Sequence, residues 1–143
     1  MTISHMMATV TSAAASQAVA AAVAHAAKRG AAVVAAVVDV SGDLVACLRA
    51  DGAFSASVEI ARDKAWTAAV FKTSTDDLAA ALSHREVLRE GIALRPGVVL
   101  FGGGLPIVEN GQIVGAIGVS GGSEDDDRAA AAAGLAVLGP TPA

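Results

Sequence analysis

The sequence predicts one α+β domain in which an antiparallel sheet is flanked by helices. Its 143 residues are the length of a single ordinary domain. Apolar residues make up 54% of the chain and charged residues 17%, which favours a folded protein over a disordered one. Two pairs of apolar runs are each joined by a tight turn, which indicates local hairpins and argues against a βαβ unit.

The first part of the chain carries the signals of a helix followed by a hairpin. Residues 11–29 are rich in alanine, the strongest helix former, and are followed by Gly30, a common helix-ending residue. Residues 33–40 form a valine-rich run that is typical of a strand buried on both faces. A Ser-Gly turn joins this run to residues 43–49, which predicts the first hairpin.

Helical patterns return in the middle of the chain. Ser55 or Ser57 can cap a second helix that runs to about Phe71. A Ser-Thr-Asp-Asp sequence resembles a capping box and predicts a short helix over residues 78–84. Residues 85–97 contain two glycines and a proline, and we expect an irregular connection there.

The last part of the chain predicts three more strands and a helix. Residues 98–101 form a strand that runs into three glycines, and extended structure resumes over residues 105–109. The following Asn-Gly pair is a strong hairpin turn, because type I′ turns need positive φ at both positions. Residues 112–119 return as the final strand, and Ser123 caps a helix that ends near Gly139. The predicted order is αββααβββα, with five strands.

Composition sets the expected boundaries and excludes several classes of function. We expect a flexible leader at residues 1–10, one domain over residues 11–139 and a tail at residues 140–143. A net charge of −4 and an aromatic content of 3% argue against nucleic-acid binding. The alanine-rich first helix is too weakly apolar to predict a membrane span. The single cysteine and the lack of a positively charged secretory signal favour a cytoplasmic protein.

Three consecutive glycines form the first candidate site. Gly102, Gly103 and Gly104 could cradle an anion with their backbone N–H groups. A dinucleotide site needs a helix after the glycines, however, and here Pro106 and a strand follow. The loop is therefore a bulge where the strand bends, or bare backbone that lets a flat ligand lie against it, and the two readings are compatible.

Charged side chains provide the next candidates. Arg62 and Lys64 could hold the carboxylate of a haem propionate or of a small acid, unless they belong to a solvated helix face. Asp39 ends an apolar strand and needs a partner, either the backbone of its own turn or a cation such as Lys64. His84 could ligate haem iron or act as a general base, although a histidine at a helix end commonly interacts with the helix dipole.

No metal site is predicted. None of the three histidines has a ligand spacing with another histidine or with the cysteine. The four consecutive acids at residues 124–127 lack the spacing of a calcium loop, and acids in a first helical turn complement the helix dipole.

Three segments in order resemble the GlcG/HbpS family, also called the haem-degrading domain family and found as the C-terminal domain of PduO proteins. They are VVDVSGDLVACLRADGA at residues 37–53, SVEIARDKAWTAAVF at residues 57–71 and VVLFGGGLPIVENGQIVGAIGVSGG at residues 98–122. The likeness covers about residues 11–138, and residues 81–97 depart from the common family pattern. It implies a profilin-like three-layer α/β/α fold with a five-stranded antiparallel sheet, and homo-oligomers from dimers to octamers.

The resemblance also implies a ligand and the residues that bind it. Some members of the family bind haem or a corrinoid, so haem is the implied cofactor of this chain. The residues expected to bind it are Arg62, Phe101, Gly102, Gly103, Gly104 and Pro106. Asp39 and Asp127 match the family motif as polar residues of structural importance.

Two functions remain open at this point. The first is a small-ligand-binding protein for haem or a related tetrapyrrole. The second is an enzyme of small-molecule catabolism, an isomerase, tautomerase or lyase, in which Arg62 anchors a substrate carboxylate. Lys64, His84 or an aspartate would then transfer the proton.

The alanine content leads to a prediction about assembly. Alanine accounts for 35 of the 143 residues and is concentrated in the first, second and last predicted helices. Small residues let helices pack closely against a sheet or against another subunit. We therefore expect an alanine-lined helix face to form the interface of a homo-oligomer.

Overall fold

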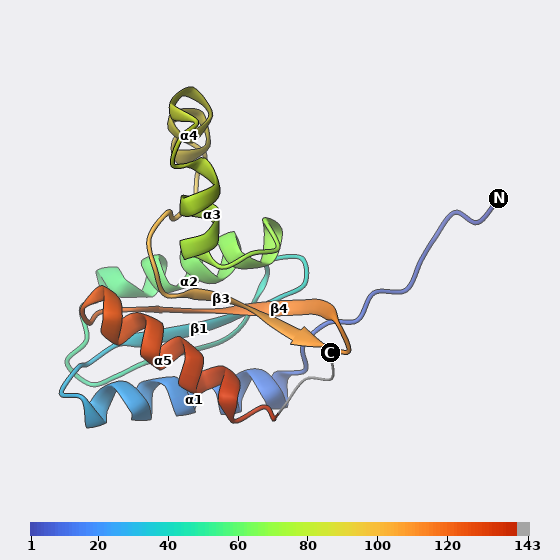
Figure 1. Cartoon of the computed structure of the whole chain (residues 1–143). Helices are drawn as coiled ribbons and strands as arrows, with labels where there is room; N and C mark the ends of the chain where they lie inside the picture. The colour runs from blue at the N-terminus through green and yellow to red at the C-terminus, as the bar shows by residue number, and fades with distance from the viewer. Residues whose placement is uncertain (140–143) are drawn as a thin grey trace.

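An antiparallel sheet lies between one helix on one face and two helices on the other, and a pair of short helices projects beyond these layers (Figure 1). The computed structural model describes residues 1–139, which contain four strands and five helices. The strands are β1 (Val34–Asp39), β2 (Leu44–Arg49), β3 (Gly104–Glu109) and β4 (Gln112–Ser120). The helices are α1 (Ser12–Lys28), α2 (Ala56–Val70), α3 (Thr75–Leu82), α4 (Glu86–Ala93) and α5 (Glu124–Ala136).

The two predicted hairpins form the two halves of the sheet. β1 pairs with β2, β3 pairs with β4, and the pairing of β1 with β4 joins the halves in the order β2-β1-β4-β3. All three pairings are antiparallel. At the tip of the second hairpin, Asn110 and Gly111 adopt φ values of 52° and 75°. The predicted antiparallel sheet between helices is thus confirmed.

The sheet within residues 1–139 has four strands, so the expected fifth strand at residues 98–101 is wrong. A threonine of α2 directs this segment away from the sheet. The Thr67 hydroxyl donates to the Gly97 carbonyl (2.9 Å) and accepts the Val99 N–H (3.0 Å). Because the backbone is bonded to a helix side chain at this point, the segment runs as a loop over α2 until β3 begins.

The irregular connection expected at residues 85–97 is also wrong, because it contains α4. The helix starts with a bond from the Arg89 N–H to the Arg85 carbonyl (2.8 Å). Its internal glycine is tolerated, since the residues are otherwise good helix formers. α5 ends at Ala136, before the expected end near Gly139, because the last N–H groups bond three residues back in a turn. The tail expected at residues 140–143 lies outside the described residues.

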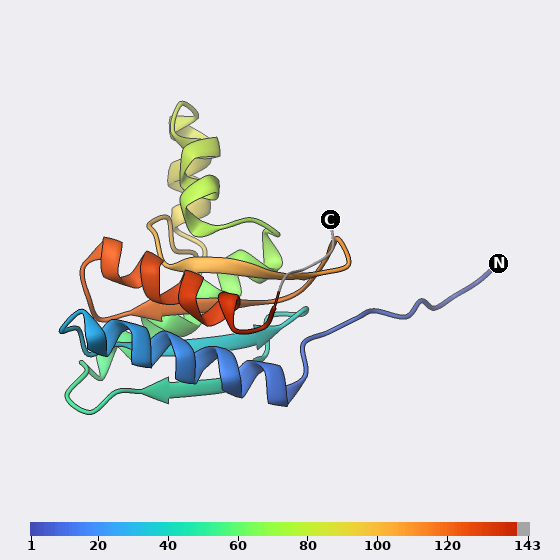
Figure 2. The same ribbon diagram turned by 60° about the horizontal axis from the view of Figure 1, so that its bottom comes forward.

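α1 and α5 cover one face of the sheet and lie side by side in both views (Figure 1 and Figure 2). Fourteen buried residues, all Ala, Val or Ile, form the core on this face. A Cβ at Gly134 would lie 2.6 Å from Ile117 Cδ1 and 2.8 Å from the Ala18 carbonyl oxygen, so glycine allows the close approach. Buried alanines therefore fill the space within this layer, and an oligomer interface formed by alanines stays a prediction.

α2 covers the other face and lies close to the backbone of β4. Gly118 makes this approach possible, because a Cβ there would overlap the Ala61 carbonyl oxygen. The buried side of α2 presents mostly alanine to the strands. Lys64 lies on the same side and is 1% exposed, so the close packing of α2 carries a charged side chain to the end of β4.

The expected leader is bonded to the sheet at its last two residues. Thr9 Oγ1 accepts the Val40 N–H (3.0 Å), and the Val10 N–H donates to the Val114 carbonyl (2.8 Å). Toward the N-terminus the leader extends away from the other elements in both views (Figure 2), and residues 5–8 line a cavity with residues that include Lys72 and Gln112.

Candidate functional site

A cavity of about 310 Å³ opens at the C-terminal end of β4, between this strand, α2 and the first turn of α5. Its lining consists of Phe54, Ser57, Ile60, Lys64, Phe101, Ser120, Gly121, Gly122, Glu124 and Asp127. The cavity therefore brings together three residues that the sequence singles out, namely Lys64, Phe101 and Asp127.

Lys64 is the buried cation of this cavity. Its ammonium donates to the Val119 carbonyl (2.8 Å) and to Asp127 Oδ2 (3.1 Å), and it lies 5.1 Å from the centroid of the Phe101 ring. The helical period of α2 places Lys64 on the same side as the buried Ala61, which packs against β4. Burial lowers the pKa of the Lys64 ammonium, and the negative charge of Asp127 opposes that shift.

Asp127 lies in the first turn of α5 but does not cap the helix. Ser123 and Asp126 form the capping box instead, which leaves the Asp127 carboxylate free to point inward. Its Oδ1 accepts the Gly122 N–H (3.0 Å) and its Oδ2 bonds to Lys64. Burial raises the pKa of the Asp127 carboxyl, and Lys64 opposes the shift. Lys64 and Asp127 thus form a buried ion pair with side-chain exposures of 1% and 6%.

Two buried serines bring hydroxyl groups to the same cavity. Ser57 lies in the first turn of α2 and is 4% exposed, and Ser120 ends β4 and is 6% exposed. Neither hydroxyl has a hydrogen-bond partner within residues 1–139, although every fully enclosed side-chain nitrogen and oxygen there has one. The two hydroxyls are therefore not fully enclosed, and the opening that reaches them is the cavity that they line.

Two phenyl rings lie at the mouth of the cavity. Phe54 is 70% exposed and Phe101 is 50% exposed, and both line the opening. They are two of only three phenylalanines in the chain. Exposed aromatic rings beside a cavity that contains a few polar groups are typical of a binding site for an organic ligand.

The three consecutive glycines are explained by close packing. A Cβ at Gly103 would lie 2.9 Å from Lys64 Nζ, and one at Gly104 would lie 2.5 Å from the Lys64 carbonyl oxygen. A Cβ at Gly102 would overlap the Arg128 guanidinium. The loop therefore lies directly against α2 and α5, and it fixes the position of the phenylalanine that precedes it. Contact between these glycines and a ligand stays a prediction.

An arginine outside the predicted set holds the rim of the cavity together. Arg128 donates two hydrogen bonds to Asp76 (both 2.8 Å), one to Glu124 (2.8 Å) and one to Asp125 (3.0 Å). Glu124 also accepts the Gly102 N–H (2.9 Å). These bonds join α3, the glycine loop and α5. The i, i+4 spacing of Glu124 and Arg128 is a sequence signal for part of this network.

Four predicted site residues lie away from this cavity. Arg62 is exposed, and its position two residues before Lys64 places it about 160° away around α2. His84 is exposed and lines a separate cavity formed by residues 84–88, at the start of α4. Pro106 lies in β3 and faces a cavity shared with α5. The Asp39 carboxylate accepts two backbone N–H groups of its own turn (2.9 and 3.0 Å), the first of the two partners considered for it.

Among the cavity residues that were not expected to bind a ligand are two serines and a phenylalanine, namely Ser57, Ser120 and Phe54. Ser57 has a sequence signal, because it lies four residues before Ala61 and seven before Lys64, on the buried side of α2. Ser120 lies in the segment at residues 98–122 that resembles the family. Phe54 has no such signal, since it reaches the cavity through the arrangement of segments that are distant in the sequence.

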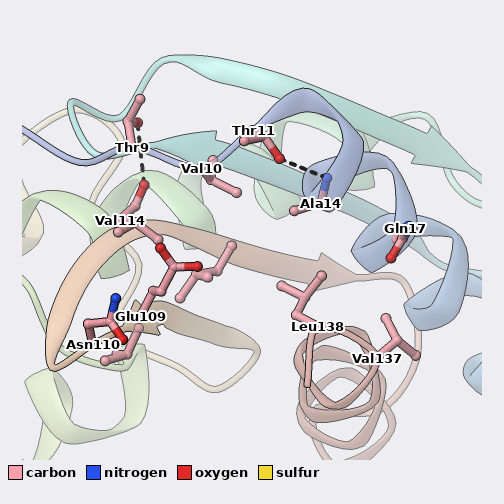
Figure 3. A pocket seen from close by; sticks show the side chains of 12 residues that line it. Thr9, Val10, Thr11, Ala14, Gln17, Glu109, Asn110, Val114, Val137 and Leu138 are labelled. Carbon is pink, nitrogen blue, oxygen red and sulfur yellow. Dashed lines mark hydrogen bonds between the residues drawn. The ribbon is translucent and has the colours of Figure 1, made fainter. Parts of the chain in front are cut away.

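A second cavity, of about 410 Å³, lies at the other end of β4, between the leader, the β3-β4 hairpin and the end of α5 (Figure 3). Its threonines take part in folding. Thr11 Oγ1 accepts the Ala14 N–H (3.2 Å) at the start of α1, and the Thr9 hydroxyl donates to the Val114 carbonyl (3.4 Å) (Figure 3). Glu109 is its one titratable lining residue. The smaller cavity at Lys64 is therefore the better candidate on chemical grounds.

Residues 1–139 contain neither a cluster of potential metal ligands nor a helix that could span a membrane. No three His, Cys, Asp or Glu side chains within these residues are close enough to hold a metal ion. None of the helices in the described part of the chain has both the length and the apolar character that crossing a bilayer requires.

Known proteins contain domains that are similar in sequence to this chain. The profile of a family described as "Haem degrading protein HbpS-like" matches residues 10–136. An uncharacterized 15.0 kDa protein in the dhaT-dhaS intergenic region of Citrobacter freundii is 38% identical over 130 residues, which are 90% of this chain and 91% of that protein.

Two solved structures are similar over nearly the whole chain. The crystal structure of HbpS has a TM-score of 0.87 and 38% sequence identity, and the match covers 96% of each chain. The crystal structure of a PduOC:heme complex has a TM-score of 0.77 and 31% identity, covering 90% of this chain and 94% of that one.

Proposed function

The chain belongs to the HbpS-like family, and from this premise we propose that it binds a flat organic ligand of the tetrapyrrole class, such as haem. The observation that carries the proposal is the pair of exposed phenyl rings, Phe54 and Phe101, at the mouth of the Lys64 cavity. The haem complex of the related PduOC supports the choice of ligand class. The ring of the ligand would lie against the two phenyl groups.

The side chains of the cavity fit the macrocycle better than they fit the iron of haem. Haem iron is held in proteins by His, Cys, Met or Tyr side chains, and none of these types lines this cavity within residues 1–139. The Lys64 ammonium is already bonded to Val119 and Asp127. The proposal therefore assigns binding to the faces and edges of the macrocycle, with no iron ligand from this cavity.

The predicted ligand residues enter the proposal in different ways. Phe101 would contact the ligand directly. Gly102, Gly103 and Gly104 would act by holding Phe101 at the mouth, because their lack of side chains lets the loop pack against α2 and α5. Arg62 is left out of the proposed site because it points to another side of α2.

A titration with two porphyrins tests the proposal. Haemin is followed by its Soret band and metal-free protoporphyrin IX by its fluorescence, at stoichiometric protein concentrations. We expect saturable binding of both, with dissociation constants within about threefold of each other, since no iron bond contributes. Phe101→Ala should weaken binding of both about tenfold or more, which corresponds to the loss of one phenyl contact.

The matched control is Val87→Ala, which truncates an apolar residue that is 84% exposed on α4, outside the cavity. This variant should bind both porphyrins like the wild type. The absence of a saturable change with either porphyrin, or equal binding by Phe101→Ala and the wild type, would overturn the proposal.

One observation favours the alternative of an enzyme. Lys64 and Asp127 are a buried acid-base pair whose pKa values burial shifts toward each other, as is common at sites of proton transfer. His84 lines a different cavity, so such a reaction would use Lys64 and Asp127. Incubation with small 2-oxo acids in D2O tests this alternative by NMR. Deuterium incorporation at C3, the carbon next to the keto group, that Lys64→Met abolishes would support it. Incorporation at the rate of buffer alone would exclude it for this substrate class.

A further inference from the structure

The inner end of the Lys64 cavity contains hydrogen-bonding groups that the fold does not use. The hydroxyls of Ser57 and Ser120 have no partner within residues 1–139, although both residues are more than nine-tenths buried. Two threonines are buried on the same side of the sheet and are bonded to the backbone. Thr67 bonds to the loop before β3, and Thr75 accepts the N–H of Gly104, the first residue of β3. The hydroxyls of the two threonines are therefore bonded within the fold, and the hydroxyls of the two serines are available to a ligand.

A glycine lets the backbone after Ser120 pass close to the start of β1. Gly121 has a φ of +127°, and a Cβ at this position would lie 2.8 Å from the Ala32 carbonyl oxygen and 3.5 Å from Ser57 Oγ. The chain therefore turns tightly beside the two serines, and both serines line the cavity.

Each charged side chain that lines the cavity already has a partner of opposite charge. Lys64 is paired with Asp127, and Glu124 is paired with Arg128 on the rim. A charged ligand group that entered the cavity would lose its hydration and find no free counter-ion. An uncharged oxygen would lose less hydration and could exchange hydrogen bonds with the two hydroxyls, which both donate and accept.

We propose that the inner end of this cavity is a subsite for an uncharged oxygen group, a hydroxyl or a carbonyl, carried by a small organic ligand. The oxygen binds the hydroxyls of Ser57 and Ser120, and the attached ring or chain lies between Phe54 and Phe101. This inference rests on the site of the proposed function, because it shares the phenyl rings at the mouth. It goes beyond that function in the ligand, because it assigns a neutral oxygen, whereas the oxygens of haem belong to ionised propionates. The subsite selects neutral ligands over ionised ones, whereas the phenyl rings alone do not make this selection.

A series of four probes with one phenyl ring and different substituents tests the subsite. The probes are toluene, benzyl alcohol, benzaldehyde and benzoate, and binding is followed by backbone amide shifts of the 15N-labelled protein. We expect benzyl alcohol and benzaldehyde to bind, with shifts at Ser57, Ser120 and Gly121. Benzoate should bind at least about tenfold more weakly than benzyl alcohol, because its charge is desolvated without a free counter-ion.

Serine variants identify the groups that recognise the oxygen. Ser57→Ala and Ser120→Ala should each weaken benzyl alcohol about threefold to tenfold, the effect of one neutral hydrogen bond. Neither variant should change the binding of toluene. Ser16→Ala is the matched control, because Ser16 is exposed on α1, and it should bind all four probes like the wild type. Circular dichroism and thermal unfolding verify that each variant is folded.

The outcomes separate this inference from the proposed tetrapyrrole binding. Binding of benzyl alcohol that depends on both serines, together with no binding of porphyrin, would support the subsite and reject the tetrapyrrole. Benzoate binding more tightly than benzyl alcohol would overturn the subsite. Equal binding of benzyl alcohol by both serine variants and the wild type, or no binding of the neutral probes at all, would also overturn it.

Discussion

The two faces of the sheet are built from different kinds of side chain. On the α1 and α5 face, all fourteen buried core residues are Ala, Val or Ile. The α2 side also buries alanine and valine, but the polar residues Ser57, Lys64, Thr67, Thr75 and Ser120 are buried there too. Alternate residues of β1 and β4 point to opposite faces of the sheet. The same two strands therefore contribute side chains to the apolar face and to the face that also buries polar residues.

The difference separates the residues that stabilise the fold from the residues that are available to bind a ligand. Apolar burial stabilises the first face without specifying individual partners. Burying polar groups costs free energy unless each group is bonded, and on the α2 side Lys64, Thr67 and Thr75 all have bonded partners. The serine hydroxyls are the exception. The comparison therefore predicts that substitutions on the α2 side will have more varied effects than those on the other face.

The largest effect is expected where α2 touches β4. Gly118→Ala places a Cβ on the Ala61 carbonyl oxygen, a backbone atom that cannot move without shifting α2. We expect a loss of about 3 kcal/mol or more in the free energy of unfolding, measured by urea denaturation. Gly91→Ala in α4, where no atom lies within 4 Å, is the matched control and should stabilise the protein by about 0.5–1 kcal/mol. Similar stabilities for the two variants would contradict the proposed close packing.

The buried ion pair should behave asymmetrically. Asp127→Ala leaves the Lys64 ammonium buried without its counter-ion and should cost about 3–5 kcal/mol of unfolding free energy. Lys64→Met with Asp127→Asn replaces both charges by neutral groups and should cost clearly less than Asp127→Ala alone. Urea denaturation of the wild type, Lys64→Met, Asp127→Asn and the double variant gives the coupling energy. Additive losses would mean that the two charges do not interact across 3.1 Å.

Two hydroxyls on the α2 side should differ in their contribution to stability. Thr67→Val removes a hydroxyl with two backbone partners, Gly97 and Val99, and should cost about 1–3 kcal/mol. Ser57→Ala removes a hydroxyl that bonds to nothing in the described residues and should change stability by less than about 0.5 kcal/mol. Thermal unfolding of both variants measures the difference. A loss for Ser57→Ala as large as that for Thr67→Val would mean that Ser57 serves the fold.

Local sequence patterns predict most of the fold for identifiable reasons. Both hairpins follow from short apolar runs joined by turns, and the Asn110-Gly111 turn has the backbone that its residues favour. Ser123 caps α5 as its sequence position indicates. The expected strand at residues 98–101 fails because an apolar run looks the same whether it pairs with a strand or packs on a helix. The Thr67 hydroxyl decides between the two, and its partners lie 30 and 32 residues away.

The candidate site is less predictable, because its contacts join distant segments. Lys64 and Asp127 are individually visible in the sequence, but their pairing spans 63 residues and depends on how α5 meets α2. Arg62 and Lys64 look equivalent as cations two residues apart, whereas the helix buries one and exposes the other. The sequence does not predict that the hydroxyls of Ser57 and Ser120 are free. Whether a buried hydroxyl has a partner depends on where all the other buried polar groups lie in the folded structure.

A small loss of stability is predicted for the exposed pair of Asp76 and Arg128, which contrasts with the buried pair beside it. Hydrogen bonds from Arg128 hold the pKa of the Asp76 carboxyl below its usual value of 3.8. Both side chains are about two-fifths exposed, so Asp76→Asn should cost at most about 1 kcal/mol at pH 7.

As the pH falls below 3.8, the unfolded chain takes up the proton of the Asp76 carboxyl before the native protein does, which favours unfolding. The stability difference between the wild type and Asp76→Asn should therefore be constant from pH 7 to pH 5 and shrink below about pH 4. Urea denaturation at pH 7, 5, 4 and 3 measures this difference, and an equal difference at pH 3 and pH 7 would assign the effect of the substitution to packing.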